Sequence, residues 1–313
     1  MVFAAGLGTR LAPLTQRLPK PVVPLMNRPL ARYSLEALAA AGVERCALNT
    51  HHLADAVPEA LEGHVPTGMT ARFVHEPKLL GTGGGLRHAL TALIDEFGAD
   101  DDTPILVMNG DILFWPELER ALAVHRRLGA VATVVLRDHP QARRLGALEL
   151  DAGGRVRRLL GEPEDVDVPT TVHMFTGVHV LSRRALRDLP AEGCIIRTAY
   201  RRWLDTDETV AGIVSDTPWR DLGTPREYLR AQLDLLSGRE RWPGLERPGD
   251  GVLRGVDVRV GEGAVLREVV LGDGAIVEAG VHLERVMVWP GTRVSGDAHD
   301  AILAPHATVS VEA

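Results

Sequence analysis

Apolar runs and helix-like patterns alternate along the first two thirds of the chain. Short runs such as Ile105-Leu-Val-Met108 are typical of buried strands, whereas the longer segments between them repeat apolar residues at helical spacing. This alternation predicts a layered α/β domain. The expected strands are 1–5, 43–49, 70–75, 105–108 and 130–136, and the expected helices are 30–41, 53–61, 85–97, 118–128, 183–188, 196–204 and 225–236. Between 145 and 180 the pattern indicates strands and turns, with a hairpin turn at Asp151-Ala-Gly-Gly154.

The pattern changes after 237–250, a stretch with glycine, proline and many charges that we interpret as a linker. Beyond it, aliphatic residues return every five or six positions with glycine at a fixed offset, as in Val260-Gly-Glu-Gly-Ala-Val265. In a β-helix of hexapeptide repeats the aliphatic residue fills the core and the glycine turns the corner. We therefore expect two domains, 1–236 and 251–313, the second a short β-helix, with a glycine-rich β-sandwich as the alternative. A stack this short favours a homo-oligomer, because its apolar ends need cover from the first domain or from a second subunit.

The opening segment ends an apolar strand in a glycine loop, Ala4-Ala-Gly-Leu-Gly-Thr-Arg10, and Lys20 follows between two prolines. Gly6 and Gly8 carry no Cβ that would keep a phosphate away from the backbone N–H groups. An arginine can form paired hydrogen bonds to phosphate oxygens, and a lysine supplies a compact charge. These residue types in this order indicate a polyphosphate site.

Two common glycine loops are excluded. The dinucleotide fingerprint G-x-G-x-x-G fails at Leu11, and no Gly-Lys-Ser/Thr closes a P-loop. The longer pattern G-x-G-T-R-L-x-P-L-T with P-K-P resembles the signature of the sugar-1-phosphate nucleotidyltransferases, and the resemblance extends along roughly the whole chain. It implies a Rossmann-like mixed-sheet nucleotidyltransferase domain followed by a left-handed β-helix domain. In this family the loop grips the triphosphate, the arginine assists departure of pyrophosphate and the lysine contacts the phosphates being joined. These roles fall on Ala5, Gly6, Gly8, Thr9, Arg10 and Lys20.

Two aspartates are candidate metal ligands. Asp111, in Asn109-Gly-Asp, follows a buried strand, and ligands bind at such strand ends in open α/β sheets. Magnesium prefers oxygen and bridges carboxylates to phosphates. Judged alone, Asp111 could instead cap a turn. The element Trp219-Arg-Asp-Leu-Gly-Thr-Pro225 resembles the family's second metal motif, which implies that Asp221 completes a Mg²⁺ site.

Further motifs imply contacts to the base and the sugar. Glu76 and Leu80-Gly-Thr-Gly-Gly-Gly-Leu86 resemble the family's base and ribose element, so Glu76, Gly81 and Thr82 are expected to bind nucleotide. Consecutive glycines that open a helix suit a planar ring lying against the backbone, or a plain loop-to-helix junction. On the sugar side the resemblance implies Asn109, Gly146, Glu162 and Thr176. The chain departs from the family here, because the lysine of its E-K-P element is replaced by Glu162 and its N-x-G reads Phe175-Thr-Gly.

Composition limits the remaining possibilities. The net charge of −7 argues against a general nucleic-acid binder, and two cysteines are too few for a disulfide scaffold or a zinc cluster. No apolar run reaches the length of a membrane span and no secretory leader precedes the first strand, so we expect a cytoplasmic protein without membrane partners.

The reaction we expect is the Mg²⁺-dependent attack of a sugar 1-phosphate on the α-phosphorus of a nucleoside triphosphate, which releases pyrophosphate. A glycine-rich base loop with a short β-helix is similar to the bacterial mannose-1-phosphate guanylyltransferases within this family, which favours GTP and mannose 1-phosphate. The alternatives are a UTP- or dTTP-dependent enzyme acting on a glucose, heptose or N-acetylmuramate phosphate, and a non-catalytic subunit that senses nucleotide sugars.

Overall fold

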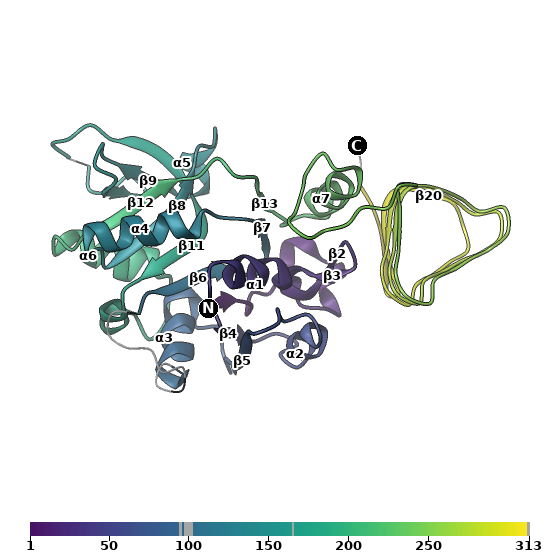
Figure 1. Ribbon diagram of the computed structural model, residues 1–313, viewed down its shortest axis with the longest axis horizontal. Coiled ribbons are helices and arrows are strands. Elements are labelled where there is room, and N and C mark those ends of the chain that lie inside the picture. Colours follow the sequence, from purple (N-terminus) through teal and green to yellow (C-terminus); the bar gives the residue numbers. More distant parts are fainter. Residues whose placement is uncertain (94–95, 97–102, 165, 312–313) are drawn as a thin grey trace.

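A nine-stranded sheet with helices on its two faces forms the N-terminal part of the computed structural model, which describes residues 1–93, 96, 103–164 and 166–311 (Figure 1). The sheet strands are β1 (Val2–Phe3), β4 (Arg45–Thr50), β5 (Thr70–His75), β6 (Ile105–Asn109), β8 (Ala132–Arg137), β9 (Ala147–Leu150), β10 (Val156–Leu159), β11 (Thr171–Leu181) and β12 (Val210–Val214). The helices are α1 (Leu30–Ala40), α2 (Ala56–Leu61), α3 (Gly81–Leu93), α4 (Leu118–Leu128), α5 (Ala142–Leu145), α6 (Arg201–Asp205) and α7 (Pro225–Ser237).

The order of the strands explains where a ligand can bind. Strands β6, β1, β4 and β5 are parallel neighbours, so their carboxyl ends meet at one edge. The long strand β11 runs antiparallel between β6 and β8, and its first half extends beyond that edge to pair with β9. The β9–β10 hairpin therefore lies past the carboxyl ends of the core strands. The expected α/β domain is confirmed, with a mixed sheet.

Apolar side chains cover the two faces of this sheet separately. One cluster packs α1, α2 and α4 against β4, β6 and β11, and a second packs α3 and the segment around Trp203 against the other face. Two smaller ribbons complete the first part, β2 (Pro24–Leu25) with β3 (Arg28–Pro29) and β7 (Ile112–Phe114) with β13 (Trp219–Asp221). Among the described residues no helix is long and apolar enough to cross a membrane.

Several element boundaries differ from the expectation. Helix α3 begins at Gly81 rather than 85, because the glycine run itself is helical, and residues 94, 95 and 97 of the expected helix lie outside the described residues. The expected helix at 183–188 is a 3₁₀ helix, η4 (Arg183–Asp188), and the one at 196–204 divides into a π-helical turn, η5 (Ile196–Tyr200), and α6. The opening strand is confined to β1, which is followed by the short 3₁₀ turns η1 (Thr9–Leu11), η2 (Leu14–Gln16) and η3 (Lys20–Val22).

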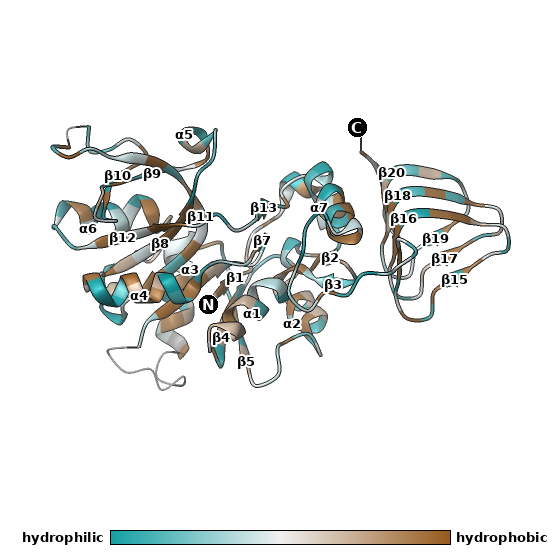
Figure 2. Ribbon diagram, turned by 45° about the horizontal axis from the view of Figure 1, so that its top comes forward, coloured by the Kyte–Doolittle hydropathy of each residue, from teal (hydrophilic) through white to brown (hydrophobic). Residues whose placement is uncertain are grey.

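The C-terminal part is a stack of parallel strands in two sheets, closed by one antiparallel strand (Figure 2). Its strands are β14 (Val252–Arg254), β15 (Arg259–Val260), β16 (Val265–Leu271), β17 (Ile276–Val277), β18 (His282–Val288), β19 (Arg293–Val294), β20 (Ala298–Ala304) and β21 (Ala307–Ser310). Residues with positive φ recur at matching places in successive coils, at Glu268, Arg285 and Asp300 and again at Gly263 and Gly280. The chain therefore turns at repeated corners, as the spacing of the glycines indicated.

Helix α7 connects the stack to the first part. Tyr228 and Leu229 of α7 belong to one apolar cluster with Met287 and Ile302 of the stack. Trp242, within the expected linker 237–250, is buried in the same cluster, where its ring lies 4.8 Å from that of Tyr33. The segment carries no helix or strand after Ser237. Glu240 and Trp242 anchor it by being buried, whereas most of residues 241–250 are exposed.

Candidate active site

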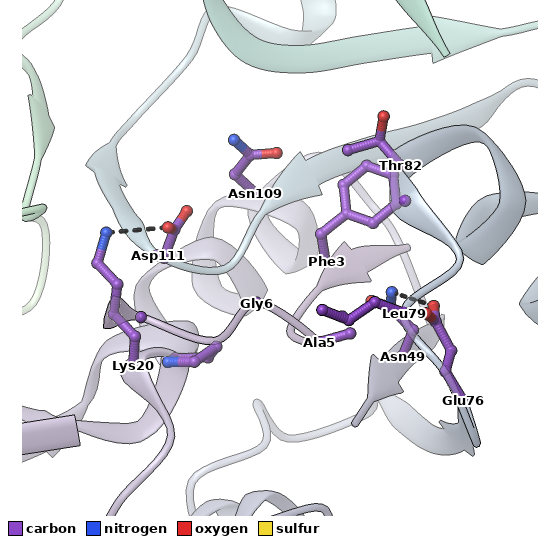
Figure 3. Close-up of a pocket in the computed structure, with 13 residues that line it drawn as sticks. Phe3, Ala5, Gly6, Lys20, Asn49, Glu76, Leu79, Thr82, Asn109 and Asp111 are labelled. Carbon is purple, nitrogen blue, oxygen red and sulfur yellow. Dashed lines mark hydrogen bonds and ion pairs between the residues drawn. The ribbon is translucent and has the colours of Figure 1, made fainter. Parts of the chain in front are cut away.

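A cavity of about 230 Å³ opens at the carboxyl ends of β1, β4 and β6 (Figure 3). Of the residues expected from the sequence, it is lined by Ala5, Gly6, Gly8, Lys20, Glu76, Gly81, Thr82, Asn109 and Asp111. The structure therefore gathers in one place residues from the opening loop, from the start of α3 and from the end of β6.

The glycine loop is held close to Lys20. Gly8 has φ +63, and a Cβ there would come within 2.9 Å of the Cβ of Lys20. The Thr15 hydroxyl donates a 2.9 Å hydrogen bond to the carbonyl oxygen of Gly8, which fixes the loop. Gly6 is different, because a Cβ at this position would meet no atom within 4 Å. The backbone at Gly6 is thus open toward the cavity.

Two cationic side chains, those of Lys20 and Arg10, converge on Asp111 and Asp221. The ammonium of Lys20, whose side chain is only 5% exposed, lies 2.9 Å from Asp111 Oδ2 and 3.2 Å from Asp221 Oδ1. Arg10 donates to the other oxygen of Asp221 at 3.0 Å and lies against Gly223, where a Cβ would meet the guanidinium. One buried cation thus holds two partly exposed carboxylates side by side.

Local backbone structure places the two carboxylates together. In the β7–β13 ribbon Asp221 pairs with Ile112, the residue that follows Asp111. Gly110 lets the chain pass close to β1 there, because a Cβ would lie 2.8 Å from the carbonyl oxygen of Phe3, to which the Gly110 amide donates a hydrogen bond. The two expected metal ligands, far apart in the sequence, are neighbours in this ribbon.

The pair suits a divalent ion that completes its coordination with phosphate. Among the described residues no group of three or more His, Cys, Asp or Glu side chains is arranged to hold a metal by itself. Magnesium in polyphosphate sites commonly takes one or two protein carboxylates and fills its other positions with phosphate oxygens and water. Asp111 and Asp221, side chains 36% and 30% exposed, provide that donor set.

The wall opposite the charged cluster is built around Glu76, which is 1% exposed. Glu76 accepts hydrogen bonds from Asn49 Nδ2 at 2.7 Å and from the Leu80 amide at 3.0 Å, while Asn49 Oδ1 accepts from the Ala4 amide at 2.9 Å. Asn49 lines the cavity together with Phe3, Pro21 and Leu79, which the sequence analysis did not select. The sequence shows Asn49 only as a polar residue near the end of a strand, and its role becomes visible through its hydrogen bonds to Ala4 and Glu76.

The glycine run at the start of α3 has a packing role that the sequence did not reveal. A Cβ at Gly83 or Gly84 would lie within 2.6–2.7 Å of Pro190 or the carbonyl oxygen of Ala191, and one at Gly85 would collide with Glu76. The Gly83 amide donates to the carbonyl oxygen of Gly193 at 2.8 Å. These glycines therefore admit the segment 190–193 and the buried Glu76. The sequence analysis had offered either a planar ring lying against the backbone or a plain loop-to-helix junction.

The expected sugar-side residues lie partly outside the cavity. Gly146, with φ +118, adjoins the Phe175 amide, which donates to its carbonyl oxygen. Glu162 is exposed and forms an ion pair with Arg201. Thr176 is 1% exposed and its hydroxyl donates to the carbonyl oxygen of Val135 at 2.6 Å, so its side chain is not presented to the cavity. Thr9, Arg10 and Asp221 also lie outside the cavity lining, but Arg10 and Asp221 adjoin it through Lys20.

Relatives with known names share most of this chain. It is 33% identical over 299 residues to a mannose-1-phosphate guanylyltransferase of Mycobacterium tuberculosis, covering 94% of this chain and 80% of the relative. Mannose-1-phosphate guanylyltransferase 1 of Arabidopsis thaliana is 28% identical, covering 99% of this chain and 86% of the relative. A UTP–glucose-1-phosphate uridylyltransferase of Synechocystis is 28% identical, with 82% and 69% covered.

A solved structure and a family profile also match the chain. The crystal structure of HddC from Yersinia pseudotuberculosis complexed with GMP-PN superposes with a TM-score of 0.58 at 23% identity, covering 74% of this chain and 96% of HddC, which supports the fold alone. The family profile described as nucleotidyl transferase matches residues 1–238. The protein belongs to the nucleotidyl transferase family.

Proposed function

We propose that the protein transfers a guanylyl group from GTP to mannose 1-phosphate, giving the nucleotide sugar and pyrophosphate. The observation that carries the proposal is the Lys20 ammonium, which gathers Asp111 and Asp221 at a cavity walled by the glycine loop. The names of the Mycobacterium tuberculosis and Arabidopsis thaliana relatives, similar over nearly the whole chain, favour this base and this sugar.

The chain's own residues then have distinct tasks. The open backbone at Gly6, with Ala5, Gly8 and Thr9, approaches the triphosphate, and the exposed guanidinium of Arg10 steadies the leaving pyrophosphate. Lys20 offsets charge where the two phosphates meet. A phosphate oxygen of the sugar attacks the α-phosphorus as the bond to pyrophosphate breaks, so positioning and charge neutralisation supply the rate without a protein nucleophile.

Asp111 and Asp221 would hold the metal, which we propose to be Mg²⁺. When bound, the ion would neutralise developing charge on the phosphates. The Lys20 ammonium lies between these carboxylates in the free protein, and we expect it to release at least one of them when metal and phosphates bind.

The two ends of the cavity divide the substrates. We assign the wall of Glu76, Gly81 and Thr82 to the nucleoside, because it faces the cavity through backbone and amide groups. Asn109 lines the cavity at the end of β6, and we assign the sugar to its side, toward Gly146 and the loop that carries Glu162.

The wider organisation completes the proposal. We assign residues 1–236 to the catalytic domain and 251–313 to a left-handed β-helix, with 237–250 as the linker; the recurrent corners and parallel pairing support the β-helix. We also propose a homo-oligomer that works in the cytoplasm.

The test is release of pyrophosphate with Mg²⁺, for GTP, UTP, dTTP, ATP and CTP each combined with a panel of sugar 1-phosphates. We expect GTP with mannose 1-phosphate to be the productive pair and Asp111→Asn to abolish it. Asp257→Asn, at an exposed position of the C-terminal stack and outside the cavity lining, serves as the control and should retain activity.

Other outcomes would replace the proposal. Turnover of UTP with glucose 1-phosphate would support the reaction named for the Synechocystis relative. A panel without turnover, with nucleotide sugar still bound, would mean that the chain is a sensing subunit of the same fold.

A further inference from the structure

Arg220 lies between Trp219 and Asp221 in β13, and its side chain is anchored outside the cavity lining. Successive side chains of a strand point to opposite faces, so Arg220 is directed away from the side of the ribbon that carries Asp221. It reaches α7 and the segment that follows α7. The residue next to an expected metal ligand is thus tied to a different layer of the molecule.

Two buried carboxylates hold this arginine. Arg220 Nη2 donates to Asp234 Oδ2 at 2.6 Å, and Arg220 Nε lies 2.5 Å from Glu240 Oε2. The side chains of Asp234 and Glu240 are only 9% and 8% exposed. The Glu240 amide also donates to the carbonyl oxygen of Asp234 at 3.0 Å, which joins the two carboxylate positions into one unit.

The two carboxylates of the cluster shift in opposite directions: burial raises the pKa of Glu240 above its ordinary value, and the Arg220 guanidinium offsets this only in part. Burial by itself would raise the pKa of Asp234, but hydrogen bonds from Arg239 and Arg220 outweigh burial and hold that pKa below its ordinary value. A charged carboxylate against a guanidinium gives short, directional hydrogen bonds. The contact therefore fixes the orientation of Arg220 and not only its charge.

The ribbon that carries Asp221 needs such an anchor. It consists of two strands only, and its register pairs Arg220 with Leu113 and Asp221 with Ile112. An isolated two-stranded ribbon is marginally stable, so its side-chain contacts decide where it lies. On the other side, Trp219 Nε1 donates to the carbonyl oxygen of Thr176 at 2.9 Å. The ribbon is thus fixed from both sides, and Arg220 is its link to α7.

We propose that Asp234 and Glu240 are positioning residues that set the place of Asp221 through Arg220. Helix α7 packs against β16, β18 and β20, so the clamp formed by Arg220, Asp234 and Glu240 connects the C-terminal stack to the divalent-metal site (Figure 1). The inference rests on the proposed function, because it takes Asp221 as a metal ligand.

The experiment measures metal binding directly. Mn²⁺ is titrated into the full-length protein with a non-hydrolysable GTP analogue, and free Mn²⁺ is followed by electron paramagnetic resonance. The variant Arg220→Met with Glu240→Gln removes one charge of each sign, and we expect it to bind Mn²⁺ about tenfold more weakly, the size typical of changes in the outer shell of a metal site. KM for nucleotide at saturating metal should change less than twofold.

A matched control separates positioning from general destabilisation. Arg239 also contacts Asp234, at 2.5 Å, but its side chain is 61% exposed and, among the residues that the structure describes, it forms no ion pair with a residue of β13. Arg239→Gln should lower the melting temperature somewhat and leave Mn²⁺ affinity unchanged. If the double variant does not fold, Glu240→Gln alone decides, with about threefold weaker Mn²⁺ binding expected.

The outcomes distinguish the two levels of the argument. Wild-type protein that binds nucleotide but no Mn²⁺ would overturn the metal site of the proposed function, and the clamp with it. Wild-type protein that binds Mn²⁺, with the clamp variants binding it equally well, would overturn the clamp alone. Weaker Mn²⁺ binding in the clamp variants and in Arg239→Gln alike would also overturn it, since the effect would then be general.

Discussion

Gly6→Ala tests whether the loop backbone meets the phosphates, because it separates folding from binding. A Cβ at Gly6 would have no atom within 4 Å, and the residue is not in the left-handed region of φ. Alanine at such a position restricts the unfolded chain and leaves the folded one unstrained, so the free energy of unfolding should stay the same or rise by about 0.4–1 kcal/mol. The added methyl group should therefore not destabilise the protein in the absence of nucleotide.

The same methyl group should weaken the binding of the nucleotide. Gly6 lines the cavity, and a phosphate that approaches its backbone N–H would meet the new methyl group. Forcing a methyl group into a packed contact costs about 1–3 kcal/mol, which is about 5- to 150-fold in the dissociation constant of the nucleotide. We expect Gly6→Ala to melt at or above the wild-type temperature while binding GTP more weakly within that range.

Calorimetric titration with a non-hydrolysable GTP analogue, next to thermal melting, measures the two quantities. Gly296→Ala is the control, since a Cβ there also meets no atom within 4 Å but the residue lies in the C-terminal stack. Gly8→Ala gives the contrast, because φ of +63 and the 2.9 Å approach to Lys20 should cost stability as well as binding. Unchanged nucleotide affinity in Gly6→Ala would refute the proposal that the backbone of the glycine loop contacts the phosphates.

Three further predictions follow from the same contacts. Lys20→Met should reduce pyrophosphate release at least about 100-fold. It should also lower the melting temperature in metal-free buffer, because Asp111 and Asp221 then repel each other, and added Mg²⁺ should restore part of that loss. Full activity in the variant would contradict the role of Lys20. Burial lowers the pKa of His125 from 6.5 to about 4 and that of His179 from 6.5 to about 3, so the unfolded chain binds protons more readily than the folded chain. The free energy of unfolding should therefore fall as pH drops below about 6.5, by up to about 1.4 kcal/mol per pH unit for each histidine. Urea unfolding from pH 7.5 to 5 measures this dependence, and a free energy of unfolding that does not change with pH would count against it. Gly261→Ala should destabilise the stack by about 1–3 kcal/mol because its Cβ meets the Ala279 backbone, whereas Gly296→Ala should not; equal urea midpoints for the two variants would be the contrary result.

Local patterns predicted the elements of the first domain because strands and helices leave different periods in the sequence. Apolar runs marked β6 and β8, and the strand end at Asn109 pointed to the cavity. The partner of a glycine is not a local property. Nothing near Gly83 and Gly84 shows that the segment 190–193 lies against them, since that contact depends on how distant parts of the chain fold together.

The same reason limits the prediction of the site. Asp111 could be selected as a strand-end carboxylate, but its meeting with Asp221 depends on the register of the β7–β13 ribbon, which the sequence alone does not determine; only the family resemblance joined them. Asn49 was missed because its importance comes from hydrogen bonds to Ala4 and Glu76 across neighbouring strands. Thr176 was selected because of its place in the family motif, but its hydroxyl donates a hydrogen bond to the carbonyl oxygen of Val135 and does not face the cavity.

The apolar cluster shared by α7 and the stack bears on how the protein can be cut. The family profile ends at residue 238, which suggests a convenient place to truncate. A fragment that stopped there would lose Trp242, Met287 and Ile302 and leave the apolar side of α7 open to water. Because that apolar surface would be exposed, we expect such a fragment to aggregate. The intact chain, in which α7 and the stack share one cluster, should melt in a single cooperative step.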